Sequence, residues 1–506
     1  MKRSLSRWTT HRTTKICSTR LPTQPNSADG QVPILMNEQN YIILKDSLLN
    51  GIQWEAIGNK NIQGETIGDK KVTPGNALKA LEALDKQYKE GKVNIIRLLE
   101  YRNNSDLLCP ITYSNVEIDN RSVKDFTVYT SHYIGRCRIN ETDISINPRF
   151  GEKVFNYLLS YATGLYVPQG ESSFEKNKSN SYWLLTIIWK AMLNKAITQG
   201  HVPKEYVTET RNLKHYHGRL NLQKHIRANM CDASRFYCTN RKLTPNTTIN
   251  RTIRYTYKLL MQKKMGYLLN DFTSYDRKLA SFGVDNDPVE IHEIDHIRYT
   301  RLNAAYKPLM ELCRTLIACR AAEGKEGTAQ ADVAYFIDVA DLWEMYLLRL
   351  LQNQLPGYHV FSPNATSGDF LLENRMREIR PDILIKKDER TRMVIDAKYK
   401  DYETFGRTAQ EPNCVQRDDL YQMSTYLYHY GTENEPITGI FCSPVKTATT
   451  EGELFTLQHD SNHHIGLVNL SLDNGNNKDD DEVLTQVKKA EESFIKRIRE
   501  LLETSA

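Results

Sequence analysis

The 506-residue sequence has no long apolar run and no nucleotide-binding loop. No stretch approaches the roughly 18 consecutive apolar residues that a membrane-spanning helix needs, so we predict no membrane segment. The pattern G-x-x-x-x-G-K-[ST], whose backbone cradles nucleotide phosphates, is absent. We therefore do not expect the chain to hydrolyse nucleotides by itself.

Cysteine is scarce, with nine residues, an odd number, and no C-x-x-C pair. This usage favours reduced thiols and a cytoplasmic location over a disulfide-stapled secreted protein. A zinc site is conceivable where Cys231 and Cys238 lie near His215, His217 and His225 in the sequence. The missing close cysteine pair argues against it.

Positive charge is unevenly distributed. Residues 204–264 contain 14 Lys or Arg against 3 Asp or Glu, in a chain whose total charge is only +5. Lys and Arg neutralise phosphates, so this segment is the candidate surface for a nucleic-acid backbone. A merely solvated basic face is the alternative.

Length and periodicity predict an α+β protein of several domains. The first 28 residues hold six Lys or Arg and no acid, which predicts a disordered basic arm. A transit peptide, or an extension of a protein that starts near Met36, is the alternative. The predicted order is a basic arm (1–33), a mixed β-rich module (34–150), a helical middle domain carrying the basic, DNA-facing segment (151–331), an α/β domain (332–472), and an acidic linker with a last helix (473–506).

Apolar periodicity gives the elements of the first three parts. Alternation predicts early strands near 126–129, 133–139 and 144–146, after a helix at 76–88. A period of 3.6 residues predicts middle helices at 154–166, 182–197, 249–260 and 302–319. Thr247 or Thr248 is expected to cap the third of these helices.

The stretch richest in chemistry is a predicted β-hairpin. Short apolar runs at 383–385 and 393–395 are separated by a charged turn. Asp382 begins the first strand, and Asp396 and Lys398 end the second. Because side chains alternate along a strand, Asp396 and Lys398 project from the same face.

Two carboxylates beside an ammonium group predict a metal-dependent hydrolytic site. Neighbouring carboxylates repel unless a divalent cation lies between them, and hard oxygen ligands suit Mg²⁺ or Mn²⁺. Such a cation polarises a phosphodiester and activates water. Lys398 would orient that water or neutralise charge on the phosphate. A surface hairpin with ordinary exposed charges is the alternative.

This hairpin resembles the signature of the PD-(D/E)xK nuclease superfamily, with Pro381-Asp382 and Asp396-Ala397-Lys398 in the two strands. The resemblance implies an αβββαβ core. Its expected elements are a long helix ending near Gln354, strands at 358–361, 382–386 and 392–400, a helix at 415–430, and a strand at 438–442. Further strands are predicted at 454–457 and 465–470, and a last helix at 483–502.

Two flanking features strengthen the resemblance. A helix before the hairpin often supplies an acidic residue, and Glu344 is the candidate here. The RecB-like nucleases carry Gln-x-x-x-Tyr on the helix after it, and Gln422 and Tyr426 have that spacing, which puts both on one helix face. A solvated Glu344 and a core aromatic Tyr426 are the alternatives.

The wider order of motifs resembles McrC, the nuclease subunit of modification-dependent, 5-methylcytosine-directed restriction systems. The resemblance covers about residues 120–472. It depends on Gly218-Arg219, the Asn250 helix, Trp343-Glu344, Pro381-Asp382, Asp396-Ala397-Lys398-Tyr399 and Leu420-Tyr421-Gln422 in that order.

The resemblance implies a partner and a division of roles. A McrB-like AAA+ GTPase hexamer translocates DNA and recognises methylated cytosine, while the McrC-like subunit docks on it, stimulates the GTPase and cuts. Asp382 and Asp396 would bind metal and Lys398 would be catalytic, with Glu344 and Gln422 in support.

The expected function is therefore an Mg²⁺-dependent DNA endonuclease subunit in antiviral defence. A stand-alone PD-(D/E)xK nuclease of repair or recombination is an alternative. Another is a non-catalytic activator of a ring NTPase, against which the intact Asp382, Asp396 and Lys398 argue. Residues 1–110 receive no role.

Overall fold

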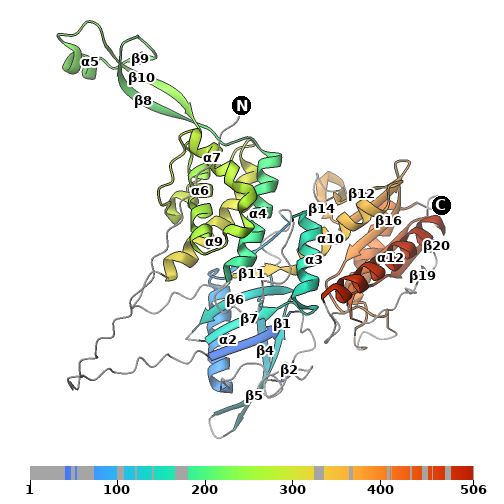
Figure 1. The fold of residues 1–506 in the computed structure, drawn as a ribbon. Coiled ribbons are helices and arrows are strands. Elements are labelled where there is room, and N and C mark those ends of the chain that lie inside the picture. The colour runs from blue at the N-terminus through green and yellow to red at the C-terminus, as the bar shows by residue number, and fades with distance from the viewer. Residues whose placement is uncertain are drawn as a thin grey trace, which may run out of the picture. The chain divides into compact units, whose positions relative to one another are not determined.

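The computed structural model shows a mixed α/β fold with several helices and several sheets, as predicted (Figure 1). It divides into two units, residues 1–38 and 39–506, and every residue described here belongs to the second. The predicted basic arm (1–33) and residues 473–479 of the predicted acidic linker lie outside the described residues. The structure describes residues 40–46, 52–53, 73–99, 107–119, 122–139, 142–165, 181–323, 335–363, 369–406, 411, 413–432, 436–446, 454–458, 460–472 and 480–504.

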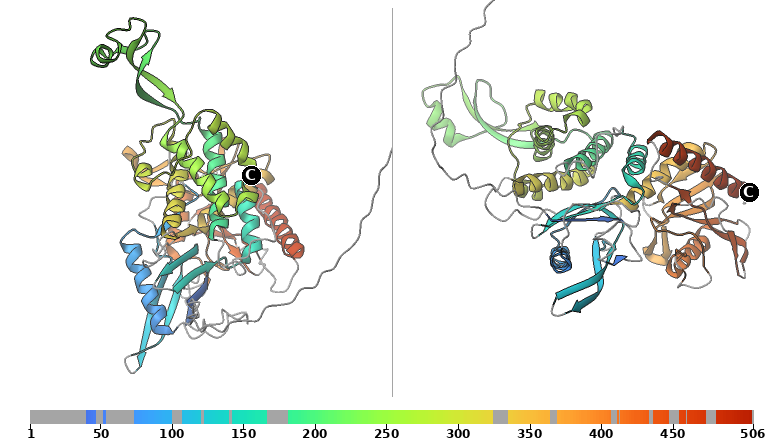
Figure 2. Two further views of the ribbon diagram at one scale, coloured as in Figure 1. Left: turned by 60° about the vertical axis from the view of Figure 1, so that its left-hand side comes forward. Right: turned by 60° about the horizontal axis from the view of Figure 1, so that its bottom comes forward.

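The N-terminal part is organised around a five-stranded sheet of order β1-β7-β6-β11-β3. Its strands are β1 Asn40–Lys45, β3 Asn94–Ile96, β6 Tyr133–Ile139, β7 Thr142–Asn147 and β11 Tyr335–Asp338. A second sheet, of order β2-β5-β4, consists of β2 Ile52–Gln53, β4 Ile111–Asp119 and β5 Ser122–Thr130. Helix α2 (Pro74–Lys89) lies against these strands and buries Leu81 and Leu84 with Phe126 (Figure 2).

Strand β11 lies just after the predicted domain boundary at 331/332 but joins the N-terminal sheet. It follows the helical middle in sequence, yet it pairs with β6 on one side and β3 on the other. All four of its residues are buried, and Phe336 belongs to the core under α2. A short buried strand can pair with any strand whose free edge it reaches. The periodicity of its own sequence does not show which sheet it will join.

Gly135 allows β11 to approach β6 closely. Gly135 pairs with Phe336 across the two strands. A Cβ atom at Gly135 would lie 2.2 Å from the backbone oxygen of Tyr335. Any larger residue therefore forces the strands apart.

The middle part contains a helical body, with helices close to the four predicted ones. The helices are α3 Gly151–Thr163, α4 Ser181–Gln199, α6 Thr248–Gln262, α7 Thr273–Ser281, α8 Ile291–Asp295 and α9 Lys307–Glu323, with 3₁₀ turns at Gly266–Leu268, Asn270–Phe272 and Ala304–Tyr306. Thr247 caps α6 by accepting a hydrogen bond from the Asn250 amide, as expected for one of the two threonines.

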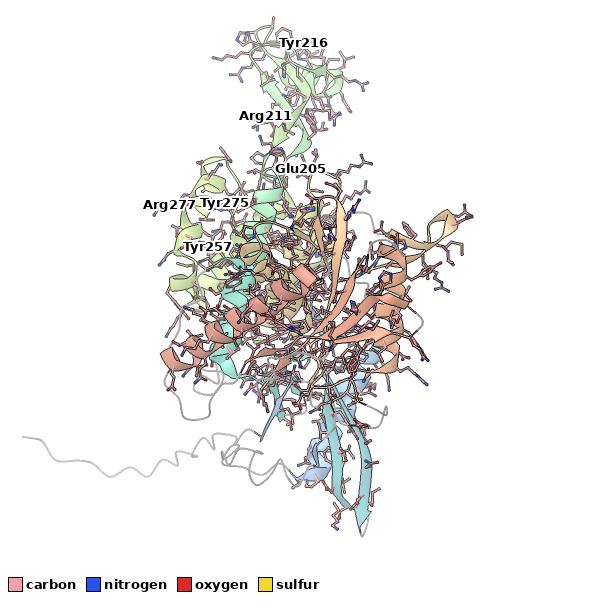
Figure 3. The ribbon with its side chains drawn as sticks, turned by 90° about the vertical axis from the view of Figure 1, so that its right-hand side faces the viewer. Glu205, Arg211, Tyr216, Tyr257, Tyr275 and Arg277 are labelled. Atoms are coloured by element: carbon pink, nitrogen blue, oxygen red, sulfur yellow. The ribbon has the colours of Figure 1, made fainter. Side chains whose placement is uncertain are left out.

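The middle part is not helical throughout, because residues 205–244 form an extended structure that we call the ribbon. Strands β8 Glu205–Leu213 and β10 Phe236–Thr244 pair antiparallel along their whole length. Strand β9 Arg219–Leu220 and helix α5 Leu222–Asn229 lie at the far end (Figure 1). Figure 3 shows Glu205, Arg211 and Tyr216 in succession along it.

Asn250 fixes the base of the ribbon. Its buried side-chain amide donates to the carbonyl oxygens of Pro203 (2.9 Å) and Pro245 (2.7 Å). These prolines stand just before β8 and just after β10. One side chain on α6 therefore holds both strands where they leave the helical body.

The C-terminal part contains a six-stranded sheet of order β12-β15-β16-β17-β20-β19. Its strands are β12 His359–Phe361, β15 Ile383–Lys387, β16 Arg390–Ala397, β17 Thr438–Cys442, β19 Leu454–Leu457 and β20 Asp460–Leu467. On one face Ile385 and Ile395 share a core with helix α10 (Val339–Gln354). On the other face Leu384 and Val394 share a core with helix α11 (Arg417–Tyr430).

The elements predicted for this part occur in the predicted order, with three corrections. The strand predicted at 392–400 ends at Ala397, so Lys398 lies just beyond it. The strand predicted at 465–470 is split, because β20 ends at Leu467 and β21 (Leu470–Ser471) pairs with β18 (Pro444–Val445). Helix α12 (Asp480–Thr504) starts before the predicted position, 483. Its first residues are acidic, and negative charge is favourable at a helix N-terminus.

Two further features complete the C-terminal part. A hairpin of β13 (Asp369–Leu372) and β14 (Met376–Ile379), with a 3₁₀ turn at Glu373–Arg375, precedes β15. Helix α12 packs against α3. None of the helices in the described part of the chain is long and apolar enough to cross a lipid bilayer.

Replacing Gly135 by alanine is expected to destabilise the protein, because the new Cβ would meet the backbone of β11. We expect a loss of about 1–3 kcal/mol in the free energy of unfolding, as for other overpacked sites. Gly75→Ala is the control, since nothing lies within 4 Å of a Cβ there and alanine favours the helix. Denaturant unfolding of both variants measures the difference, and equal stabilities would contradict the close approach.

Candidate active site

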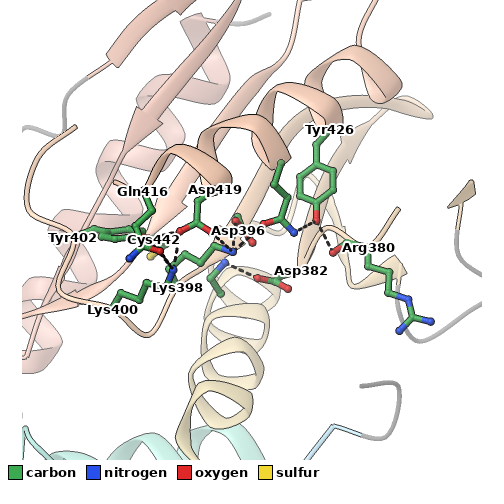
Figure 4. Close-up of polar contacts among 12 residues, drawn as sticks. Arg380, Asp382, Asp396, Lys398, Lys400, Tyr402, Gln416, Asp419, Tyr426 and Cys442 are labelled. Atoms are coloured by element: carbon green, nitrogen blue, oxygen red, sulfur yellow. Dashed lines mark hydrogen bonds and ion pairs between the residues drawn. The ribbon is translucent and has the colours of Figure 1, made fainter. Parts of the chain in front are cut away.

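Asp382 and Asp396 lie side by side at one end of the β15–β16 hairpin. The antiparallel register pairs Ile383 with Ile395, so the next residues outward, Asp382 and Asp396, face each other across the strands. Asp382 Oδ2 accepts a hydrogen bond of 2.7 Å from the Ala397 amide. Asp396 is buried, with 2% of its surface exposed. The apolar strands therefore bring two carboxylates together at the rim of a buried sheet (Figure 4).

Helix α10 brings a third carboxylate to this point. Asp338 caps the helix by accepting hydrogen bonds from the amides of Ala340 and Asp341. The buried Trp343 indole donates to the Cys442 carbonyl at 3.2 Å and ties the helix to β17. The next residue, Glu344, is only 1% exposed, which excludes a solvated position.

The Glu344 carboxyl is strongly perturbed. Burial raises its pKa well above the usual range, and the neighbouring charges of Asp382 and Asp396 raise it further. Glu344 also lies within hydrogen-bonding reach of Asp382. Burial and the two neighbouring carboxylates therefore both favour the protonated form of Glu344.

Lys398 supplies the nearest positive charge. Its ammonium lies 2.9 Å from Asp396 Oδ2 and 3.3 Å from Asp419 Oδ1, and it donates to Gln422 Oε1 at 3.0 Å. Burial by itself would lower the pKa of Lys398, but the charges of Asp396 and then Asp419 outweigh it and raise the pKa. Lys398 is therefore held as a cation in a fixed position.

Helix α11 orients Lys398 through the Gln-x-x-x-Tyr pair. Gln422 Nε2 donates to the Tyr426 hydroxyl at 2.7 Å, and that hydroxyl donates to the Arg380 carbonyl at 2.9 Å. Tyr426 is buried, so it is a core aromatic and a hydrogen-bonding residue at once. The sequence-predicted candidates Glu344, Asp382, Asp396, Lys398 and Gln422 are all brought together.

Sequence reasoning missed a second group beside the first. Asp419 lies between the ammonium groups of Lys398 and Lys400, the latter at 2.9 Å. Lys400 also donates to Tyr402 and Gln416, and the Tyr402 hydroxyl hydrogen-bonds to Asp419 (Figure 4). Two sequence spacings could have predicted this second group. Lys400 follows Lys398 by two residues, as Lys398 follows Asp396, and Asp419 precedes Gln422 by about one helical turn.

The donors present fit a divalent cation. Glu344, Asp382 and Asp396 offer the hard oxygens that Mg²⁺ or Mn²⁺ prefers. Asp396 Oδ2 is buried and makes no hydrogen bond beyond its ion pair with Lys398. Over the described residues, no group of three or more His, Cys, Asp or Glu side chains already surrounds a common point. Asp382 and Asp396 would hold the ion, with Glu344 in support.

Of the residues considered for zinc, His225 makes other contacts. His225 lies in the ribbon, with its Nδ1 near Asn229 and the Tyr237 amide. Its ring stacks on Phe236. Cys238 is buried, whereas Cys231 is exposed.

The basic segment divides into two classes of residue. Arg251 and Arg254 are largely buried on α6 and pair with Glu293 and Asp276, so they are not available to phosphates. The exposed cations on the ribbon are Arg211, Lys214, Arg219, Lys224, Arg227, Arg235, Arg241 and Lys242, and three more, Lys204, Lys258 and Lys264, are exposed outside it. Apolar side chains are exposed there too, including Met230 at 82% and Leu222 at 63%. Such a surface is typical of a contact with another macromolecule.

A family model described as a McrBC 5-methylcytosine restriction system component matches residues 128–437, more than half of the chain. The chain belongs to this family. The matched region lies within residues 120–472, where the motifs predicted the resemblance, and it contains every candidate site residue. The predicted relationship is therefore confirmed.

Solved structures similar to this McrBC family member come from Thermococcus gammatolerans. One is a half-complex from a tetradecameric assembly of McrB AAA+ hexamers with bound McrC, with 17% identity, a TM-score of 0.47, and coverage of 91% of this chain and 100% of that chain. Another is a cryo-EM structure of the McrBC complex, with 16% identity, a TM-score of 0.32, and coverage of 62% and 88%. No curated protein matches.

Adding Mg²⁺ or Mn²⁺ to the metal-free protein is expected to raise its melting temperature, because a cation offsets the repulsion of the three carboxylates. The effect should weaken as the pH falls, since protons compete with metal for Glu344 and its neighbours. Thermal unfolding with and without EDTA measures this shift. Asp382→Asn should abolish it, while Asp388→Asn, in the exposed turn of the same hairpin, should not; equal shifts would place the metal elsewhere.

Proposed function

We propose that this chain is the McrC-like subunit of a restriction system, a PD-(D/E)xK endodeoxyribonuclease that requires Mg²⁺ or Mn²⁺. The observation that carries the proposal is the meeting of Asp382, Asp396 and Lys398 at one end of a hairpin, beside the buried Glu344. Apart from the β13–β14 hairpin inserted before β15, the order α10, β12, β15, β16, α11 and β17 is αβββαβ, which supports the same superfamily.

Each side chain of the site has a distinct task in phosphodiester hydrolysis. Asp382 and Asp396 hold the cation, which when bound supplies polarisation of the phosphodiester and activation of a water molecule. Lys398 neutralises charge that builds on the phosphate oxygens as the water oxygen adds to phosphorus. Gln422 and Asp419 hold the Lys398 ammonium in place beside the phosphate. The free-energy cost of orienting the ammonium during the reaction is therefore lower.

The energy for moving along DNA has to come from a partner, because the sequence contains no P-loop. We propose a McrB-like AAA+ GTPase hexamer, on which this chain docks and whose GTPase it stimulates. The similar structures from Thermococcus gammatolerans are complexes of McrB with McrC, which supports this pairing. A stand-alone nuclease differs in one respect, since it would cut DNA with Mg²⁺ alone.

Asp396→Ala is expected to abolish cleavage while leaving the fold and the stimulation of the partner's GTPase intact, because it removes a metal ligand at a strand end. Lys398→Ala should slow cleavage by about 10²–10³-fold, as for loss of one electrostatic contact to a transition state. Plasmid cleavage with Mg²⁺, GTP or ATP, and a McrB-like AAA+ protein measures both.

The control for Lys398 is Lys387→Ala, which removes an exposed lysine from the other end of the hairpin and should cut at the parent rate. Cleavage that needs no partner would favour the stand-alone nuclease. Absence of any Lys398-dependent cleavage, with stimulation retained, would favour the non-catalytic activator.

Reversing the charges of Lys214, Lys224 and Arg227 on the ribbon should weaken DNA binding and flatten its dependence on salt, because fewer phosphates are neutralised. Equilibrium binding across a salt series measures the slope. The matched control is Arg251→Glu with Glu293→Arg, which swaps a pair that is already internal and should keep the parent slope. An unchanged slope in the ribbon variant would show that its charges serve another contact.

A further inference from the structure

The chain that carries Lys398 leaves the sheet at that residue. Ala397 is the last residue of β16. The Lys398 amide still donates a backbone hydrogen bond of 2.9 Å to the Cys442 carbonyl of the neighbouring strand β17. Residues 399–403 belong to no strand. Something other than the sheet must hold the backbone beyond Lys398.

Side chains of this extended segment contact two different parts of the protein in alternation. Lys398 and Lys400 contact Asp419 on α11. Tyr399 and Asp401 contact Arg149, which is about 250 residues earlier in the chain. The segment is therefore held by two groups of contacts. Asp419 belongs to the C-terminal part, whereas Arg149 belongs to the N-terminal part.

Arg149 is fixed by the ends of two neighbouring parallel strands of the N-terminal sheet. Asp46 follows β1 directly, and Arg149 follows β7. Asp46 Oδ1 accepts a hydrogen bond of 2.5 Å from the Arg149 amide. The two residues are almost completely buried, at 1% and 4% exposure. Burial raises the pKa of Asp46 to about 6, although the Arg149 charge opposes that shift.

The guanidinium of Arg149 reaches from this sheet to the segment beyond Lys398. It lies 4.4 Å from the centre of the Tyr399 ring and 4.7 Å from that of Phe150. Its Nη1 donates to Asp401 at 2.7 Å. A planar guanidinium stacks on a ring through its face and hydrogen-bonds through its edge, a geometry that the compact ammonium group of a lysine does not reproduce. A buried guanidinium is retained only where such partners compensate its desolvation.

We propose that Arg149 is a positioning residue for Lys398, acting through the Tyr399 ring, so that the N-terminal sheet sets the geometry of the cleavage site. This inference rests on the proposed nuclease function. A displacement of about 1 Å at a reacting group costs on the order of 10²-fold in rate. Arg149 thus ties cleavage to the position of a sheet that contributes no residue to the site itself.

Single-turnover cleavage by the full chain with its partner, Mg²⁺ and GTP tests the inference. Arg149→Gln should lower the maximal rate at least about tenfold, with the DNA dependence of the rate and the partner's GTPase unchanged. Arg149→Lys should not restore the rate. Arg277→Gln, the same substitution at an exposed site, should cut like the parent.

A second position keeps the test decisive if Arg149→Gln folds poorly. Tyr399→Leu keeps apolar volume but removes the ring and the hydroxyl that hydrogen-bonds to Asp46, and should be as slow as Arg149→Gln. The double variant Arg149→Gln with Tyr399→Leu should be no slower than either single variant, because both act along one chain of contacts.

Each other outcome is informative. Parent-like cleavage by Tyr399→Leu, or losses that multiply in the double variant, would overturn the positioning role while leaving the nuclease intact. Absence of cleavage by the parent protein itself would instead reject the proposed function.

Discussion

The repulsion among three neighbouring carboxylates is the constraint on which the C-terminal part depends. Glu344, Asp382 and Asp396 come from a helix and two strands, and none would remain beside the others without a compensating charge. Lys398 provides one such charge, and a divalent cation would provide two more. The packing of α10 and α11 on opposite faces of one sheet holds these groups together against that repulsion.

Much of the candidate site followed from local sequence, because its geometry is set by short spacings. Lys398 follows Asp396 by two residues and contacts it at the end of β16, Gln422 and Tyr426 share a helix face, and an apolar hairpin places Asp382 opposite Asp396. Such relations need only the periods of regular structure. The assignment of Glu344 required the resemblance to a known superfamily. The sequence around an acidic residue on a helix does not show whether its side chain is buried.

Other features lay beyond sequence reasoning because they join distant parts of the chain. The place of β11 in the N-terminal sheet and the contact of Arg149 with Tyr399 connect residues about 200 and 250 positions apart. The ribbon was visible only as an excess of positive charge. Its paired strands alternate apolar and polar residues irregularly, since Cys238 is the one buried residue on them and no larger core imposes a pattern.

The position of β11 limits how this protein can change during evolution. Strand β11 ends at Asp338, the residue that caps α10, so no linker separates the N-terminal sheet from the helix that carries Glu344. Recombination at this point would import a strand that must fit between β6 and β3, opposite a glycine with no room for a side chain. The two parts are therefore expected to be inherited as one piece, with exchange of segments confined to the ribbon and other surface insertions.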